Sequence, residues 1–307
     1  MIKSRAAVLM CTYNGASFLW QQLDSLASQS YSDWALWVSD DGSFDNTSEI
    51  IKTFSENTRQ PVMWLNGPCQ GFCRNFLSLL RQPQIVADYY FFSDQDDVWH
   101  PDKMSRAIHW LQQQPTNQPA LYCSRTRLID EAGQPLGYSP LFSRTPAFAN
   151  AMVQSVAGGN TMAMNDAMRR VLVELSEGAE LRSHDWWAYI VATAVGAVCY
   201  YDPETFVDYR QHENNQVGSN RGVRAIFSRL QLLLLGEFSS WNKNHIEQLE
   251  RHAHLLTPSA RRQLFLFKQL KTASLACRLG VYRRGPFYRQ TLLGNAGLLL
   301  AVLLKRL

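Results

Sequence analysis

Four short apolar runs in the first hundred residues, each followed by polar residues, constrain the fold more than any other feature. The runs span residues 6–11, 36–39, 62–65 and 89–93, and helical patterns near 18–28, 45–56 and 74–80 separate them. Strands that alternate with helices predict an α/β fold with a mostly parallel, Rossmann-like sheet and helices on both faces. In such a sheet, ligands bind beyond the carboxyl ends of the strands.

Polar clusters lie at this predicted edge of the sheet. They occupy residues 12–15, 40–43, 66–67 and 94–97. One such loop is ordinary turn chemistry, whereas four at the same edge indicate a pocket.

Asp94 and Asp96 follow an aromatic-rich run that predicts a buried strand. In an extended chain, side chains at positions i and i+2 project to the same side, so these two carboxylates can converge on one point. Oxygen ligands on such a loop suit Mg²⁺ or Mn²⁺, which completes its shell with water and substrate phosphates. The alternative is a solvated acidic loop.

Two other loops carry candidate ligands for a nucleotide. Asp40 or Asp41 can accept a hydrogen bond from a pyrimidine N–H or from ribose hydroxyls, although Asp41 can equally cap the next helix. Arg74 would open a helix, where a guanidinium can bind phosphate. An ordinary surface arginine is the alternative for Arg74.

Composition bounds the class of protein. At 307 residues, 46% of them apolar, the chain can form an α/β core and a smaller second region. Its six cysteines form no CxxC pair, so we expect reduced thiols in a cytosolic protein. The apolar run at residues 6–11 is too short for a signal peptide and is interpreted as a strand.

The charge is unevenly distributed. Residues 1–221 carry 16 Lys+Arg and 23 Asp+Glu, a balance of −7, whereas residues 222–307 carry 14 and 3, a balance of +11. This change predicts a boundary between an acidic front, residues 1–221, and a basic tail, residues 222–307.

The basic tail holds apolar clusters flanked by arginines at residues 223–235, 264–279 and 292–304, which predict helices. None reaches the roughly 18 to 20 apolar residues of a spanning helix. Helices that lie on an anionic membrane surface fit the charge and the length. A helical cap on the fold, or a homo-oligomer interface, is the alternative. Nucleic acid is disfavoured as a partner, because the arginines alternate with leucines rather than aromatics.

Three motifs, CTYNG at 11–15, SDDGS at 39–43 and FSDQDDVW at 92–99, resemble successive signatures of family 2 glycosyltransferases. These are inverting enzymes with the GT-A nucleotide-sugar fold. The resemblance covers about residues 5–220, and it implies a donor half at about 1–125 and an acceptor half at about 126–221. It also implies that the nucleotide sugar is bound by Thr12, Tyr13, Asn14, Asp40, Asp41, Arg74, Asp94, Gln95 and Arg210.

The resemblance extends to the acceptor half. Gly158, Gly159 and Asn160 resemble a glycine loop that lies beneath the transferred sugar, with a simple turn as the alternative. Asp185, in SHDWW at 183–187, resembles the catalytic base, with a helix N-cap as the alternative. Trp99 and Trp186 are expected beside the sugar or the acceptor.

The segment YRQH at 209–212 resembles one found in bacterial rhamnosyltransferase-like members, in which the loop folds over the diphosphate. In this resemblance Arg210 binds phosphate, and His212 joins Asp94 and Asp96 as a metal ligand, although isolated histidines are often structural.

The implied function is metal-dependent, inverting transfer of a sugar from a nucleotide to an acceptor. The metal neutralises the departing diphosphate, so one carboxylate suffices to deprotonate the acceptor hydroxyl. The subgroup implies rhamnose from dTDP-rhamnose, a lipid-linked glycan as acceptor, and a place at the cytoplasmic face of a bacterial membrane. Another UDP- or dTDP-sugar as donor, hydrolysis without transfer, and a non-catalytic nucleotide-sugar-binding protein remain alternatives.

Overall fold

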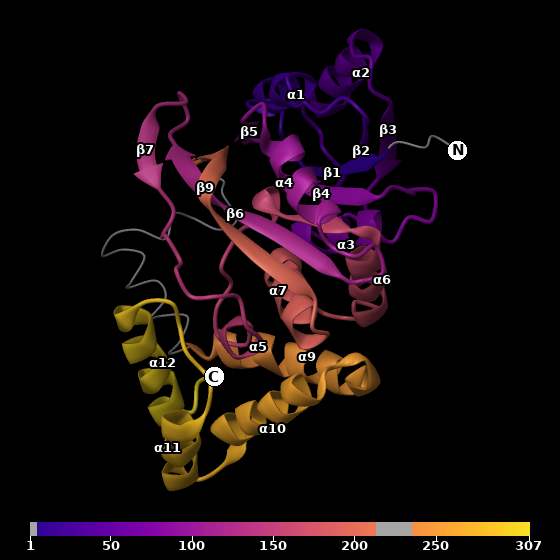
Figure 1. Cartoon of the computed structure of the whole chain (residues 1–307). Helices are drawn as coiled ribbons and strands as arrows, with labels where there is room; N and C mark the ends of the chain where they lie inside the picture. Colours follow the sequence, from indigo (N-terminus) through magenta and orange to yellow (C-terminus); the bar gives the residue numbers. More distant parts are fainter. Residues whose placement is uncertain (1–4, 213–234) are drawn as a thin grey trace.

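A nine-stranded mixed sheet runs through the molecule (Figure 1). The structure, a computed structural model, describes residues 5–212 and 235–307. The strand order is β3-β2-β1-β4-β8-β6-β9-β5, with β7 paired to β6. The first four strands, β1 (Ala6–Thr12), β2 (Trp34–Asp40), β3 (Val62–Asn66) and β4 (Tyr89–Ser93), pair in parallel. Their carboxyl ends therefore meet at one edge of the sheet.

Helices cover both faces of the parallel strands. Successive strand side chains point to opposite faces, and the residues of β1 accordingly alternate between two buried hydrophobic clusters. Helices α1 (Leu19–Ala27), α2 (Thr47–Asn57) and α4 (Lys103–Gln112) contribute to one cluster. Helices α3 (Phe72–Leu80), α6 (Asp166–Leu175) and α7 (His184–Ala194) contribute to the other.

The remaining strands extend the sheet beyond β4. Strand β8 (Ala163–Asn165) lies antiparallel between β4 and β6 (Ala120–Ile129), and β6 pairs in parallel with β9 (Val198–Arg210). Strands β5 (Val98–Trp99) and β7 (Pro135–Tyr138) pair with β9 and β6. Short turns α5 (Phe148–Ala151) and η1 (Gly159–Thr161) precede β8. The end of β9 is thereby brought beside the loop that follows β4.

The four strands and three helices predicted from the sequence of the front are present, with ends shifted by at most two residues. The long strands β6 and β9, by contrast, were not predicted. The predicted boundary at residue 221 lies outside the described residues, and so does nearly all of the predicted helix at 223–235.

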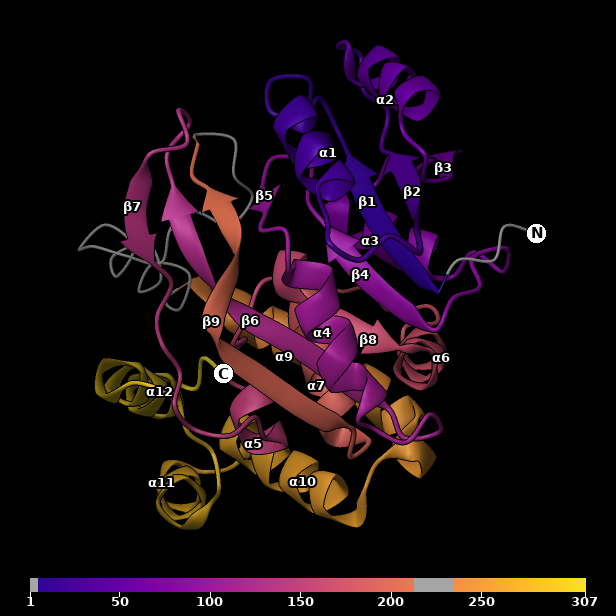
Figure 2. The same ribbon diagram turned by 45° about the horizontal axis from the view of Figure 1, so that its top comes forward.

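The C-terminal residues form α9 (Glu237–Arg251), η2 (Ala253–Leu255), α10 (Pro258–Thr272), α11 (Leu275–Arg284) and α12 (Leu292–Leu304). The predicted run at 264–279 is divided between α10 and α11, because Ala273 and Ser274 are extended. Leu249, Phe267 and Val302 are buried in the same cluster as α7, so these helices pack on the α/β core (Figures 1 and 2).

Within residues 5–212 and 235–307, no helix is both long enough and apolar enough to cross a membrane.

Candidate active site

Asp40 organises the loops at the ends of β1 and β2. The register of the two strands places Thr12 opposite Asp40, and Thr12 Oγ1 donates to Asp40 Oδ1 at 2.8 Å. Asp40 Oδ2 accepts from the backbone N–H of Ser43 at 2.8 Å. Asn14 joins the same loops, because its N–H donates to Ser43 Oγ at 2.8 Å and its Oδ1 accepts from Phe44 N–H at 3.0 Å. Thr12, Asn14 and Asp40 thus fix the shape of the loops at this edge of the sheet.

Two aromatic rings stand at this edge. The rings of Tyr13 and Phe44 lie 6.4 Å apart between centroids, and both are exposed. Rings held in this way offer flat apolar faces to a base. Sequence reasoning predicted Tyr13 but missed Phe44, whose only signal was an apolar residue within a polar turn.

Asp41 ties the end of β2 to the loop before α3. Its two carboxylate oxygens accept from the backbone N–H groups of Cys69 and Gly71, each at 2.7 Å. Gly71 has a φ of +86°, a region that favours glycine. Each carboxylate oxygen can accept a second hydrogen bond. Asp41 can therefore hold the loop and bind a nucleoside at the same time.

Gln95 fastens the acidic turn to the β1–α1 loop. Its Oε1 accepts from Tyr13 N–H at 2.8 Å, and its Nε2 donates to Tyr13 O at 3.0 Å. A side chain at Gly15 would collide with Gln95, because an added Cβ would lie 2.3 Å from Oε1. Gln95 therefore links the acidic turn to the loop after β1, two loops that the sequence predicted to bind the nucleotide sugar.

The three carboxylates of the acidic turn have different surroundings. Asp97 is fully buried, accepts from Asn160 Nδ2 at 2.6 Å, and also accepts from Arg210 N–H at 3.3 Å. Asp96 Oδ2 lies 2.7 Å from Nε2 of His212. Within the part of the chain that the structure describes, the Asp94 carboxylate makes no hydrogen bond. Burial and the charges of Asp96 and Asp185 raise the pKa of Asp94 to about 8.

Lys103 is a buried cation beneath this turn that sequence reasoning missed. Its Nζ lies 3.3 Å from the centroid of the Trp99 ring and, among the described residues, has no hydrogen-bond partner. Burial lowers the pKa of Lys103, and the charges of Asp97 and Asp94 oppose that shift. Its position, one turn after the acidic run, was the only signal in the sequence.

The donor set fits a divalent cation held mainly by its substrate. In residues 5–212 and 235–307, no group of three or more His, Cys, Asp or Glu side chains is arranged to hold a metal. Mg²⁺ commonly takes only one or two carboxylates and fills its shell with water and phosphate oxygens. Asp94, with its unpartnered carboxylate, and Asp96 beside it are the residues that would hold the ion, and His212 would support Asp96.

The glycine loop lies directly against α7. Gly159 N–H donates to Asp185 Oδ2 at 3.2 Å, and a Cβ on Gly159 would lie 2.4 Å from Nε2 of His184. Asn160 is buried and bonds to Asp97 rather than facing solvent. Gly158 and Asn160 crowd each other as well, since a Cβ at 158 would lie 2.7 Å from Asn160 Oδ1. The loop therefore joins the acidic turn to Asp185.

Asp185 is oriented by the first turn of α7. Its Oδ1 accepts from Trp186 N–H at 2.7 Å and from Ser183 Oγ. The N-cap of α7 is Ser183, whose side chain also accepts from Trp186 N–H, so Asp185 is not the cap. Helix N-termini favour negative charge, so the first turn of α7 is a favourable position for this carboxylate.

Of four further predicted site residues, all except Arg74 are buried rather than facing a ligand as expected. Arg210 is buried and donates to backbone carbonyls of Asp96, Asp130 and Glu131, so it braces the acidic turn instead of facing a phosphate. Trp99 is in the core under Lys103, because β5 pairs with β9. Trp186 is buried, and its indole N–H donates to Ala151 O at 2.7 Å. Arg74 points to Glu180, 3.7 Å away.

His184, next to Asp185, is also buried. Its ring stacks on Phe76 with centroids 4.0 Å apart, and among the described residues neither ring nitrogen has a hydrogen-bond partner. Burial lowers the pKa of His184 to about 4, and the charge of Asp185 opposes the shift. A neutral histidine therefore packs behind the glycine loop.

The loops after β1, β2 and β3 meet the acidic turn at one edge of the sheet, and the charge of Asp185 on α7 acts on Asp94 of that turn. Carboxylates gathered at the carboxyl ends of parallel strands are the arrangement of a ligand-binding enzyme site.

Comparison with known proteins gives the family. Residues 7–164 match the family model described as Glycosyl transferase family 2. The dTDP-rhamnosyl transferase RfbG of Shigella flexneri is 30% identical over 233 residues, covering 73% of this chain and 78% of that protein. The UDP-Glc:alpha-D-GlcNAc-diphosphoundecaprenol beta-1,3-glucosyltransferase WfaP of Escherichia coli is 26% identical over 108 residues, covering 34% of this chain and 41% of that protein.

The fold has solved counterparts. The crystal structure of S. aureus TarS 1-349 in complex with UDP-GlcNAc matches with a TM-score of 0.55 at 15% identity, covering 90% of this chain and 83% of that chain. The chain belongs to glycosyl transferase family 2, and its fold is the GT-A fold that the sequence motifs predicted.

Proposed function

We propose that this glycosyltransferase moves rhamnose from dTDP-rhamnose to a lipid-linked glycan, with inversion and with the help of Mn²⁺ or Mg²⁺. The observation that carries the reaction type is the position of Asp185, which accepts from Gly159 N–H at 3.2 Å, while the next residue, Asn160, donates to Asp97 of the acidic turn at 2.6 Å. The choice of donor is supported by the relative RfbG, a dTDP-rhamnosyl transferase with which this chain shares most of its length.

Different residues bind the donor and activate the acceptor. Thr12, Asp40 and Asp41 shape the nucleoside pocket, while Asp94 and Asp96 would hold the metal. When bound, the cation neutralises the charge that develops on the departing diphosphate. Asp185 takes the proton from the acceptor hydroxyl as that oxygen attacks the anomeric carbon from the opposite side.

A thermal-shift panel of nucleotide sugars with Mn²⁺ tests the donor, because a ligand that binds only the folded state raises the melting temperature. We expect dTDP-rhamnose with Mn²⁺ to give the largest rise. NMR of the transferred sugar should show an inverted anomeric centre. A panel in which no nucleotide sugar raises the melting temperature would refute the proposed function.

A UDP-sugar is the second candidate donor. It is favoured by the relative WfaP, whose name gives UDP-Glc as its donor. A larger melting-temperature rise with UDP-glucose than with dTDP-rhamnose in the same panel would select it.

The lipid-linked acceptor suggests contact with a membrane, and α12 offers the surface. Leu292 and Leu293 are 91% and 65% exposed at its start, and Lys305 and Arg306 are exposed after its end. Basic residues near anionic lipid contribute roughly 1 kcal/mol each, and exposed leucines add apolar burial. The surface of the protein that contacts the membrane would therefore be the exposed side of α12.

The membrane test uses point substitutions, because the opposite side of α12 is part of the core. Leu298, Ala301 and Val302 are buried there, so truncation would disturb the fold. Leu292→Ser combined with Leu293→Ser should weaken co-sedimentation with anionic vesicles while sparing transfer to a short soluble acceptor. Phe265→Ser, at an exposed site on α10, is the matched control. Equal sedimentation of all three proteins would refute a membrane role for this surface.

A further inference from the structure

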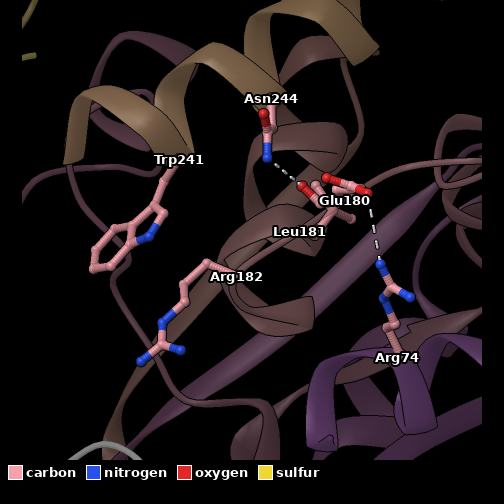
Figure 3. A pocket seen from close by; sticks show the side chains of 6 residues that line it. All are labelled: Arg74, Glu180, Leu181, Arg182, Trp241 and Asn244. Carbon is pink, nitrogen blue, oxygen red and sulfur yellow. Dashed lines mark hydrogen bonds and ion pairs between the residues drawn. The ribbon is translucent and has the colours of Figure 1, made fainter. Parts of the chain in front are cut away.

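A pocket of about 200 Å³ lies outside the loops described above (Figure 3). It is formed by the first turn of α3, the segment before α7, and helix α9. Its lining residues are Arg74, Glu180, Leu181, Arg182, Trp241 and Asn244. Asn244 Nδ2 donates to the carbonyl of Glu180 at 2.9 Å, so α9 is fastened to the segment before α7.

The pocket is close to the catalytic carboxylate. Arg182 precedes Asp185 by three residues, which limits the distance between their Cα atoms to about 11 Å. The charges of Asp185, Arg182 and Arg74 all act on the buried thiol of Cys73, whose pKa burial raises to about 12. Arg182 and Arg74 of the pocket and Asp185 therefore lie around the same buried thiol.

Trp241 gives the pocket a firm apolar face. Its ring is supported edge-on by Phe238, with centroids 5.0 Å apart, and by Trp186, with centroids 6.5 Å apart. Two aromatic supports fix the indole, and its partly exposed ring can pack against the C–H face of a sugar. The aromatic residue that the sequence suggested, Trp186, is therefore the support, while Trp241 reaches the pocket.

Arg182 gives the pocket a cation available to a ligand. Its guanidinium lies 5.5 Å from the centroid of the Trp241 ring, and the side chain is exposed. Among the described residues it makes no hydrogen bond or ion pair, whereas Arg74 pairs with Glu180 at 3.7 Å. The fork of donors on an arginine matches a carboxylate or a phosphate.

We propose that this pocket binds the acceptor glycan through a sugar that carries a phosphate or a carboxylate. The sugar ring packs on Trp241, the anionic group meets Arg182, and the Glu180 carboxylate accepts from sugar hydroxyls. This proposal rests on the proposed function, since it assigns the acceptor side of the same reaction. It also gives the C-terminal helix α9 a part in choosing the substrate.

Binding of small probes to the full-length protein tests the pocket. The probes are glucose 1-phosphate and glucuronate, compared with glucose and inorganic phosphate by ligand-observed NMR. We expect both anionic sugars to bind more tightly than glucose or phosphate alone, and the tighter of the two identifies the anionic group. Arg182→Gln should weaken their binding by roughly tenfold or more, as expected for loss of a charge-assisted hydrogen bond. It should leave glucose unaffected.

Further variants separate the ring from the charge. Trp241→Ala should weaken every sugar probe, and Trp241→Phe should restore most of the binding because it keeps an aromatic face. Arg262→Gln, at an exposed arginine on α10, is the matched control and should change nothing. Unchanged binding in Arg182→Gln and in Trp241→Ala, or inorganic phosphate binding as tightly as glucose 1-phosphate, would overturn the proposal.

The proposed function is tested separately by the nucleotide sugars. Arg182→Gln should keep the melting-temperature rise with dTDP-rhamnose and Mn²⁺. If the wild type shows no rise with any nucleotide sugar, the proposed function fails, and the probe titrations still decide whether the pocket binds anionic sugars.

Discussion

Replacing Asp185 by asparagine removes the base and also disturbs its hydrogen bonds. The carboxylate accepts from Gly159 N–H on one oxygen and from Trp186 N–H and Ser183 Oγ on the other. Asparagine has one acceptor oxygen, so its amide group must face one of these donors. A buried donor left without a partner costs about 1–3 kcal/mol of stability. Transfer should fall by about 10²- to 10⁴-fold, which is about 3–5 kcal/mol of lost transition-state stabilisation.

The assay separates chemistry from folding. It measures initial rates of nucleoside diphosphate release with acceptor present, alongside donor affinity by calorimetry and the melting temperature. Ser183→Ala is the control, because it loses the N-cap at a cost of about 0.5–2 kcal/mol but keeps the carboxylate. Donor affinity should be nearly unchanged in both variants. A folded Asp185→Asn protein that transfers within about tenfold of the wild-type rate would refute the role of Asp185 as base.

Three further outcomes are expected. Asp96→Asn should remove most of the Mn²⁺-dependent gain in nucleoside diphosphate affinity measured by calorimetry, and a gain that persists would exclude Asp96 as a metal ligand. Lys103→Met should lower the free energy of unfolding measured by urea denaturation, because the carboxylates of Asp94 and Asp97 lose the basic group buried beside them. An unchanged free energy of unfolding would contradict this. Burial lowers the pKa of His184 to about 4 and that of His245 to about 3. The unfolded chain therefore binds more protons below about pH 6.5, and stability should fall toward pH 4 by about 1.4 kcal/mol per pH unit for each histidine. His245→Phe should reduce that slope in urea unfolding, and an unchanged slope would count against His245.

The parallel half of the fold could be predicted because its signals are local. Each of its strands is an apolar run, and the polar residues that follow mark where the strand ends. Parallel pairing then places these ends together without further information, which is why Thr12, Asp40 and Asp94 could be predicted to lie at one edge of the sheet. Strands β6 and β9 are held by pairing between segments far apart in the sequence, and their pattern alternates less clearly.

The side-chain directions could not be predicted, because they depend on those distant pairings. Trp99 turns into the core since β5 pairs with β9, and Arg210 is buried because the same strand ends behind the acidic turn. Trp186 was expected to face a ligand, but α9 packs over it and presents Trp241 instead. A tryptophan beside a motif carries the same sequence signal whether it lines a pocket or supports one.

The acidic turn shows why the two halves of the catalytic fold form a single unit. Three carboxylates in four residues repel one another unless each has a partner or a cation. Asp97 takes its partners from η1 and from the end of β9, and Asp96 takes His212 just beyond that strand. The carboxylate of Asp94, by contrast, has no hydrogen-bond partner among the described residues. A donor half ending at residue 125 would lack every one of these partners, and a buried, unpartnered Asp97 would cost far more than a solvated one. The geometry of the acidic turn therefore depends on η1 and on the end of β9, both of which lie in the acceptor half.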